Sequence, residues 1–289
     1  MKQPIKYFTS DPFAVSAAIV IDVGMPDIAL KKVKETFTAL IGSFSEYDEV
    51  AVYTFSDNTK QQQDFSAALG DRTETTLKRV QVQPGRPGGA ATTEGPMISG
   101  PTVNGKVFNP GDPSQPHTTS VRYIEPPHTL NDAILRAAID LSRRPRERRK
   151  VIFVISDGRE DRSIASYTDV LKVLLSNEVQ VYALGVDTAA IPGYSKLSKI
   201  RLPRQPYGNI LPKYANATGG EVVNGMSQDA IEKAYAKMMD DARNQYTIGY
   251  TSPATLSTAY RGIEVRVSAD TSVKVYARDG YYPLPPARK

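Results

Sequence analysis

Two runs of apolar residues that each end in an aspartate constrain the fold of this chain more than any other feature. They are AAIVID at 17–22 and VIFVISD at 151–157. Apolar runs of this length predict strands that are covered on both faces, as in a parallel sheet under helices. Ligands of open α/β sheets bind beyond the carboxyl ends of the strands, where the strand order reverses. Asp22 and Asp157 therefore define a candidate site in one crevice.

Helical and strand patterns alternate along most of the chain. The apolar spacing predicts one helix after Pro26 with a buried face from Ile28 to Phe44. Further helices are predicted over 71–80, from 129, and over 167–175, 213–218 and 227–244. Further strands are predicted over 50–55, 60–65, 179–185 and 221–223, with the polar run 60–65 at a sheet edge. This order predicts an α/β fold with a doubly wound, mostly parallel sheet flanked by helices.

The organisation of the chain changes at three places. From residue 246 the apolar period becomes two, which predicts three short strands, 246–250, 263–267 and 273–276, in a small C-terminal antiparallel β extension. Residues 1–12 are an N-terminal segment that can pair with this extension. Residues 84–128 form a Gly/Pro-rich insertion, in which Asn104-Gly105 predicts a hairpin and 120–124 another strand. We therefore divide the chain into 1–12, 13–245 and 246–289.

Composition excludes several classes of protein. The chain has 289 residues, of which 40% are hydrophobic and 23% charged, as in ordinary globular proteins. It has no cysteine, which excludes disulfides and thiolate metal sites. No apolar run approaches the roughly 20 residues that span a bilayer. The net charge of +5 permits weak attraction to acidic partners without implying nucleic acid.

The basic run at 143–150 has two interpretations. It could contact phosphate or an acidic surface. We favour a structural link between a helix C-terminus, where cations are favourable, and the buried strand that follows. Since no aromatic residues interleave with the basic ones, we expect no nucleic-acid partner.

Seven motifs, spread over residues 13–283, resemble the von Willebrand factor A superfamily, and within it the bacterial group called VWFA-related or Acidobacterial-type. They are AIVID at 18–22, YDEVAVYTF at 47–55, LNDAI at 130–134, VISDG at 154–158, QYTIGY at 245–250, RGIEVRV at 261–267 and RDGYY at 278–282. The last three resemble the C-terminal tail of that group. The resemblance implies export to the periplasm or cell surface.

The resemblance also implies a metal-ion-dependent adhesion site, in which an Asp-x-Ser-x-Ser turn, a threonine and a second aspartate hold Mg²⁺. Here the turn runs from Asp22 through Gly24 and Met25 to Pro26 and carries no hydroxyl group. The threonine position falls on His128, with Thr129 one residue late. Because Mg²⁺ prefers oxygen ligands, the sequence predicts a degenerate site that lacks the usual ion.

Two alternatives for the acids remain open. Asp22, Asp157 and His128 would make a set of two carboxylates and one imidazole, which suits Zn²⁺ or another transition ion. Alternatively, Asp22 caps its turn, Asp157 ends its strand, and His128 is a solvated or dipole-placed loop residue. In that case the two carboxylates should repel each other, raising the pKa of one or recruiting Arg159 or Arg162.

These residues predict a non-enzymatic interaction domain that binds a protein at the carboxyl edge of the sheet. The expected rim of that surface comprises Gly24, Met25, Pro26, Arg159 and Glu160. The insertion 84–128 is expected to cover or replace the metal site.

Three alternatives are a cation-dependent adhesion domain that uses Asp22, Asp157 and His128 or Thr129, a scaffold whose C-terminal sheet makes the contacts, and, remotely, a hydrolase. The hydrolase would use the same acids with His128 or His117 as general base.

Overall fold

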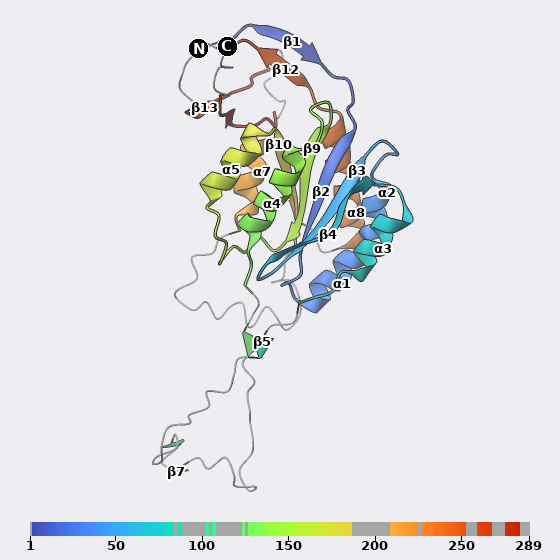
Figure 1. Ribbon diagram of the computed structural model, residues 1–289, viewed down its shortest axis with the longest axis vertical. Coiled ribbons are helices and arrows are strands. Elements are labelled where there is room, and N and C mark those ends of the chain that lie inside the picture. Colours follow the sequence, from blue (N-terminus) through green and yellow to red (C-terminus); the bar gives the residue numbers. More distant parts are fainter. Residues whose placement is uncertain are drawn as a thin grey trace. The chain divides into compact units, whose positions relative to one another are not determined.

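The structure is a computed structural model (Figure 1). It describes residues 2–83, 86–87, 102–103, 106–107, 123–124, 127–186, 209–224, 227–252, 259–267 and 275–283. The chain divides into two compact units, a small one at residues 84–126 and a larger one formed by all other residues.

A six-stranded sheet lies at the centre of the larger unit. Its strands, from edge to edge, are β11 (Val222–Asn224), β10 (Val179–Gly185), β9 (Arg149–Ser156), β2 (Val15–Asp22), β3 (Glu49–Phe55) and β4 (Thr59–Ala67). Every neighbouring pair is parallel except β3 and β4, which are antiparallel. The doubly wound, mostly parallel sheet is confirmed, with the polar strand at one edge as expected.

Helices cover both faces of this sheet (Figure 1). Alternate residues of β2 face opposite layers: Ile19 and Ile21 belong to one buried cluster, and Ala18 and Val20 to the other. The first cluster includes side chains of α1 (Asp27–Glu35), α2 (Phe37–Gly42), α3 (Asp71–Arg79) and α8 (Gln228–Arg243). The second includes side chains of α4 (Leu130–Ser142), α5 (Tyr167–Ser176) and α7 (Leu211–Thr218). β2 is therefore buried on both sides, as its sequence predicts.

The helix predicted after Pro26 is interrupted at Thr36. The Thr36 hydroxyl donates a hydrogen bond to the Val33 carbonyl (2.7 Å) and lies 3.3 Å from the Tyr235 hydroxyl of α8. A threonine that bonds back to its own helix bends that helix. Ile28 is 52% exposed and so does not belong to the buried face.

The C-terminal extension is antiparallel but pairs differently from the prediction. β12 (Thr247–Tyr250) pairs with β1 (Ile5–Thr9), which confirms the pairing expected of the N-terminal segment. Residues 263–267 are not a strand, so the predicted three-stranded sheet is wrong. Instead, β13 (Arg261–Gly262) pairs with β14 (Gly280–Tyr281). Short strands bury little apolar area, so tertiary contacts decide which neighbour each one pairs with.

The small unit contains two short strand pairs in its described residues. β6 (Thr102–Val103) pairs with β7 (Lys106–Val107) around Asn104-Gly105, which confirms the predicted hairpin. β5 (Arg86–Pro87) pairs with β8 (Tyr123–Ile124) in the region predicted as another strand. Most of the insertion, including His117, lies outside the described residues.

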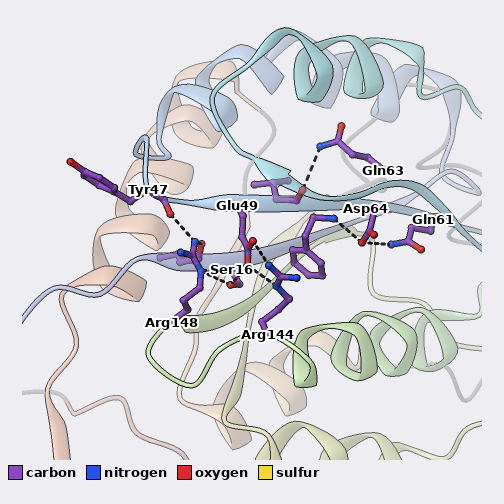
Figure 2. Close-up of polar contacts among 11 residues, drawn as sticks. Ser16, Tyr47, Glu49, Gln61, Gln63, Asp64, Arg144 and Arg148 are labelled. Atoms are coloured by element: carbon purple, nitrogen blue, oxygen red, sulfur yellow. Dashed lines mark hydrogen bonds and ion pairs between the residues drawn. The ribbon is translucent and has the colours of Figure 1, made fainter.

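The basic run at 143–150 makes contacts within the fold (Figure 2). Arg144 donates two hydrogen bonds to Glu49 (2.7 and 2.5 Å) and lies 5.0 Å from the centre of the Phe65 ring. Arg148 donates to the Ser16 hydroxyl at 2.8 Å and to the Tyr47 carbonyl at 2.7 Å. These arginines fasten the link between α4 and β9 to the amino ends of β2 and β3. These contacts of Arg144 and Arg148 agree with the interpretation of the run as a structural link.

Candidate functional site

Asp22 lies at the point where the strand order reverses. β2 pairs with β3 on one side and with β9 on the other, so Asp22 ends the first strand beside Ser156, which ends the other. The Ser156 hydroxyl donates a hydrogen bond to Asp22 Oδ2 (2.8 Å), and the Gly24 N–H donates to Asp22 Oδ1 (2.9 Å). The Asp22 side chain is fully buried. Asp22 thus caps its own turn, as one of the two alternatives expected.

His128 approaches Asp22 from the segment before α4. Its Nδ1 lies 3.0 Å from Asp22 Oδ2, and the residue is only 3% exposed. The His128 backbone is held on both sides by Asp161, which accepts from its N–H (2.7 Å) and donates to its carbonyl (3.1 Å). A solvated loop histidine is therefore wrong for this residue, because its ring is directed into the site.

Asp157 completes a group of three. One ligand atom from each of Asp22, His128 and Asp157 lies within 4.8 Å of the other two. The Asp157 carboxylate accepts from the Arg159 N–H (3.1 Å), and Oδ2 lies 3.2 Å from Arg159 Nε. The structure therefore brings together the two aspartates and the histidine that the sequence singled out. Arg159 joins them as the recruited cation.

The charges in this group shift the pKa values of two of its members. Burial and the nearby Asp22 carboxylate raise the pKa of Asp157, and Arg159 and His128 oppose that rise. Burial alone would lower the pKa of His128, but the hydrogen bond and charge of Asp22, with the charge of Asp157, raise it overall. The imidazole is thus favoured in its charged form between two acids.

Thr129 takes no part in this group. Its hydroxyl and its N–H both donate to the Ser56 carbonyl at the end of β3, at 3.0 and 2.9 Å. Its side chain therefore ties α4 to the sheet. As a ligand, Thr129 would have to give up a buried hydrogen bond.

The five residues expected to form the partner-binding rim occupy different environments. Gly24 and Pro26 are partly exposed, whereas the Met25 side chain is 1% exposed and packs in the core. The Arg159 side chain is 40% exposed. Glu160 accepts from the Asn131 N–H (2.6 Å) and from the Ser163 hydroxyl (2.8 Å), so it caps the start of α4. A partner at this edge would meet Gly24, Pro26 and Arg159 before the other two.

Sequence reasoning missed three residues that build this site. Ser156 holds Asp22, and Asp161 holds the backbone of His128, as described above. Asp132 accepts from the Ile164 and Ala165 N–H groups (3.0 and 2.8 Å), which fixes the loop after β9 against α4. Asp132 belongs to the LNDAI motif. Nothing in that motif shows that the Asp132 carboxylate accepts hydrogen bonds from a loop about 30 residues further along the chain.

The donor set fits a transition ion better than Mg²⁺. Two carboxylates and one imidazole are ligands that Zn²⁺ accepts in tetrahedral sites. In the turn after Asp22, Val23 and Met25 are buried apolar residues and Gly24 has no side chain, so the turn adds no hydroxyl ligand. The residues therefore do not match a hydroxyl-based magnesium site.

Comparison with known proteins agrees with the fold. No family model matches the sequence, and no curated protein matches it. Among solved structures, proximal thread matrix protein 1 from the mussel byssus has a TM-score of 0.52 at 15% identity; the match covers 84% of this chain and 49% of that one. A von Willebrand factor type A structure from Catenulispora acidiphila has a TM-score of 0.50 at 12% identity, covering 80% and 43%. The chain has a von Willebrand factor A-type fold.

This similarity establishes the fold alone, since identities are low and the chain spans about half the length of each matched protein. Another structure of the mussel protein, with a TM-score of 0.50 at 16% identity and the same coverage, has a zinc-occupied metal-ion-dependent adhesion motif. In the described residues of the present chain, no helix is long and apolar enough to cross a membrane.

Proposed function

We propose that this chain is a non-enzymatic protein-interaction domain of the von Willebrand factor A type, which binds its partner at the carboxyl edge of the sheet without a hydroxyl-based Mg²⁺ site. One observation carries the proposal: the His128 ring lies 3.0 Å from Asp22 and is buried between the two acids. An imidazolium there supplies the positive charge that a bound cation would supply to the two carboxylates.

The packing around the ring supports this interpretation. A Cβ atom added at Gly24 would lie 3.1 Å from His128 Cε1 and 3.2 Å from Asp22 Oδ1. The first serine of an Asp-x-Ser-x-Ser turn would stand at this position. A serine at this position would therefore crowd the histidine ring, which would have to shift by a few tenths of an ångström.

The proposal that the chain is not an enzyme rests on accessibility. Both acids and the histidine are at most 6% exposed at their side chains, and one ring nitrogen of His128 is committed to Asp22. A general base has to reach the proton that it removes. The family resemblance is the reason to place the domain in the periplasm or on the cell surface of a bacterium.

Capture of the partner tests the proposed surface. The domain and two rim variants, Pro26→Arg and Arg159→Glu, are used to capture proteins from the cell-envelope fraction of the source organism. Tyr47→Arg is the matched control, because Tyr47 is 72% exposed and precedes β3 at the opposite end of the sheet. We expect both rim variants to lose a protein that the control retains. Retention by both rim variants would contradict the proposed surface.

A second candidate function is adhesion that depends on a transition ion bound by Asp22, His128 and Asp157. The convergence of these three ligands within 4.8 Å favours it, and the zinc-occupied motif of the mussel protein supports it. Asp22, His128 and Asp157 would hold the ion, which would supply positive charge to the two carboxylates.

Thermal unfolding in the presence of Mg²⁺, Mn²⁺, Ca²⁺ or Zn²⁺ separates the two candidates. An ion present at 100 times its dissociation constant adds about 2.7 kcal/mol to the free energy of unfolding. Stabilisation by Zn²⁺ that disappears in Asp22→Ala, Asp157→Ala and His128→Ala would favour the second candidate. No response to any ion would favour metal-free binding. Stabilisation by Mg²⁺ that persists in His128→Ala would contradict both.

A further inference from the structure

β4 forms an open edge of the central sheet. In the part of the chain that the structure describes, β4 pairs only with β3, so its outer side has no strand partner. The strand is nine residues long, and Lys60, Gln61, Gln62 and Asp64 are exposed. An open edge presents a row of backbone N–H and C=O groups that another extended chain can pair with.

Two hollows lie between β4 and α4, beside this edge. One has a volume of about 410 Å³ and the other of about 200 Å³, and Gln61 and Arg136 line both. The hollows are therefore neighbours along the strand. We name them together the β4–α4 groove, which is lined by Thr59, Gln61 and Phe65 of β4 and by Asp132, Arg136 and Arg143 at the wall of α4.

The wall of α4 offers unused hydrogen-bond donors. Arg136 donates to Asp140 through Nε (2.9 Å), and Arg143 donates to Asp140 through Nη1 (3.2 Å). Within the described residues, the remaining guanidinium nitrogens of these two arginines make no hydrogen bond or ion pair. Their side chains are 55% and 73% exposed. Guanidinium groups with free donors favour carboxylates.

The acids of the groove, by contrast, are already engaged. Asp140 accepts from Arg136, Arg143 and the Tyr53 hydroxyl, and both oxygens of Asp132 accept from loop N–H groups. Asp64 accepts from Gln61 Nε2 and the Phe65 N–H (Figure 2). Asp57, just before β4 begins, accepts from the Gln83 side chain. Each acid of the groove therefore already accepts at least one hydrogen bond within the protein, whereas Arg136 and Arg143 keep donors for a ligand's acceptors.

Two further features lie at the end of the groove where β4 begins. The Thr59 hydroxyl oxygen is buried without a hydrogen-bond partner among the described residues. A buried hydroxyl without a partner costs free energy, which a polar ligand group can recover. Ile164, on the loop after β9, is 98% exposed beside it. An apolar side chain of a ligand would find a contact there.

We propose that the β4–α4 groove binds an extended segment of a protein partner, which adds to β4 as a seventh strand and directs carboxylate side chains toward Arg136 and Arg143. Strand addition uses the open backbone edge, and the alternate side chains that face α4 fall over the two arginines. The arginines lie seven residues apart on the helix, about 10 Å along its axis. Carboxylates two or four residues apart on a strand are about 7 or 13 Å apart, which long side chains can match.

This inference rests on the proposed function, because it names the class of partner that the interaction domain would bind. The groove is nevertheless a separate surface from the rim formed by Gly24, Pro26 and Arg159. The two surfaces can therefore be tested apart.

A designed peptide serves as the probe. It is a capped, fluorescein-labelled peptide of nine residues that alternates threonine and glutamate, and its binding to the whole chain is followed by fluorescence anisotropy. We expect it to bind, and we expect the same peptide with lysine in place of glutamate to bind at least tenfold more weakly. A glutamate peptide that is N-methylated at every residue has no backbone N–H to donate to β4 and should fail to bind. This comparison uses the unmodified protein, so folding of a variant does not enter.

Protein variants then locate the site. Arg136→Gln combined with Arg143→Gln should weaken binding of the glutamate peptide at least tenfold. Arg146→Gln is the matched control, because Arg146 is exposed and belongs to the same basic run without lining the groove, and it should bind as the wild type does. Failure of the glutamate peptide to bind at millimolar concentration, equal binding of the lysine peptide, or unchanged binding by the double variant would each overturn the inference.

The rim variants separate this inference from the proposed function. Pro26→Arg and Arg159→Glu should leave peptide binding unchanged. If partner capture depends on the rim while the peptide does not bind, the groove is wrong and the proposed function stands. If the peptide binds as expected while capture ignores the rim, the groove stands and the proposed surface is wrong.

Discussion

Gly24 lies so close to the His128 ring that a Cβ atom at Gly24 would stand 3.1 Å from His128 Cε1. The two residues are far apart in sequence, in a turn after β2 and in the segment before α4. Because Gly24 has no side chain, the His128 ring lies beside Asp22 without a tight contact from the turn. Gly24 and the His128 ring therefore share one packing environment beside Asp22.

Replacement of Gly24 by serine should destabilise the fold. The added Cβ is closer to His128 and Asp22 than nine in ten real Cβ contacts, so the ring or the turn has to shift slightly, at a cost of about 1–3 kcal/mol. Urea unfolding of Gly24→Ser measures this loss. The control is Gly42→Ser, since a Cβ atom at Gly42 meets nothing within 4 Å. Equal stability of both variants and the wild type would show that the ring is not confined.

Removal of the ring should reduce the cost of that serine. In the double variant Gly24→Ser with His128→Ala, the two changes should be non-additive, because the second removes the atom that the first displaces. A double-mutant cycle by urea unfolding measures the coupling, which we expect to be at least 0.5 kcal/mol. Additive losses would indicate that the two residues do not compete for space.

Asp48 should account for part of the acid sensitivity of the fold. Burial raises its pKa, but N–H groups of Ser45 and Val15 together with Arg243 outweigh burial and hold the pKa below 3.8. Since the folded-state pKa is lowered, the stabilisation is full above the unfolded value and is lost as the pH falls through the folded one. Asp48→Asn should cost about 2–3 kcal/mol at pH 7.

Urea unfolding at several pH values checks this. The difference between the wild type and Asp48→Asn should be constant from pH 7 to about 5 and should shrink below about pH 4. The control is Asp229→Asn, in an exposed pair with Lys233, which should follow the wild type at every pH. A difference that persists undiminished at pH 2 would rule out the charge of Asp48 as its cause.

Arg144→Lys should destabilise the fold although the charge is kept. Lysine cannot form the two parallel hydrogen bonds to Glu49 or stack its head group on Phe65 as a guanidinium does. We expect a loss of about 1–2 kcal/mol, since Glu49 is only 17% exposed. Arg146→Lys, at an exposed position in the same run, is the control for a general effect of the substitution. Equal midpoints of thermal unfolding for the two variants would show that the contacts of Arg144 with Glu49 and Phe65 do not stabilise the fold.

Deletion of residues 86–122 should leave the larger unit folded. The chain is anchored on both sides of the insertion, because the Gln83 side chain donates to Asp57 (2.8 Å) and the Thr129 N–H donates to Ser56 (2.9 Å). Since Ser56 and Asp57 are adjacent, a short Gly/Ser linker can span the gap. We expect one cooperative thermal transition within a few degrees of the wild type. We also predict loss of partner capture, because the sequence predicts that the insertion contributes to the contact surface.

The order of the helices and strands was predictable because it depends on local patterns. The run from Val15 to Asp22 is apolar on both faces, and its alternate residues do pack into different layers. The polar run of β4 indicated an edge for the same reason. The C-terminal extension was predictable only in part. β12 falls within the predicted strand 246–250 and pairs with the N-terminal segment as expected, whereas residues 263–267 form no strand.

The sequence by itself determined the sheet and the placement of Asp22 and Asp157 at the carboxyl ends of two parallel strands, because strand periodicity and burial are local properties. Only the tertiary structure decided what surrounds these acids. His128 contacts Asp22, which is 106 residues away in the sequence. Gly24 has no side chain that would crowd the ring, and Asp161 holds the His128 backbone by hydrogen bonds. Such contacts depend on how loops far apart in the sequence are positioned in the folded protein, and local sequence patterns do not specify this.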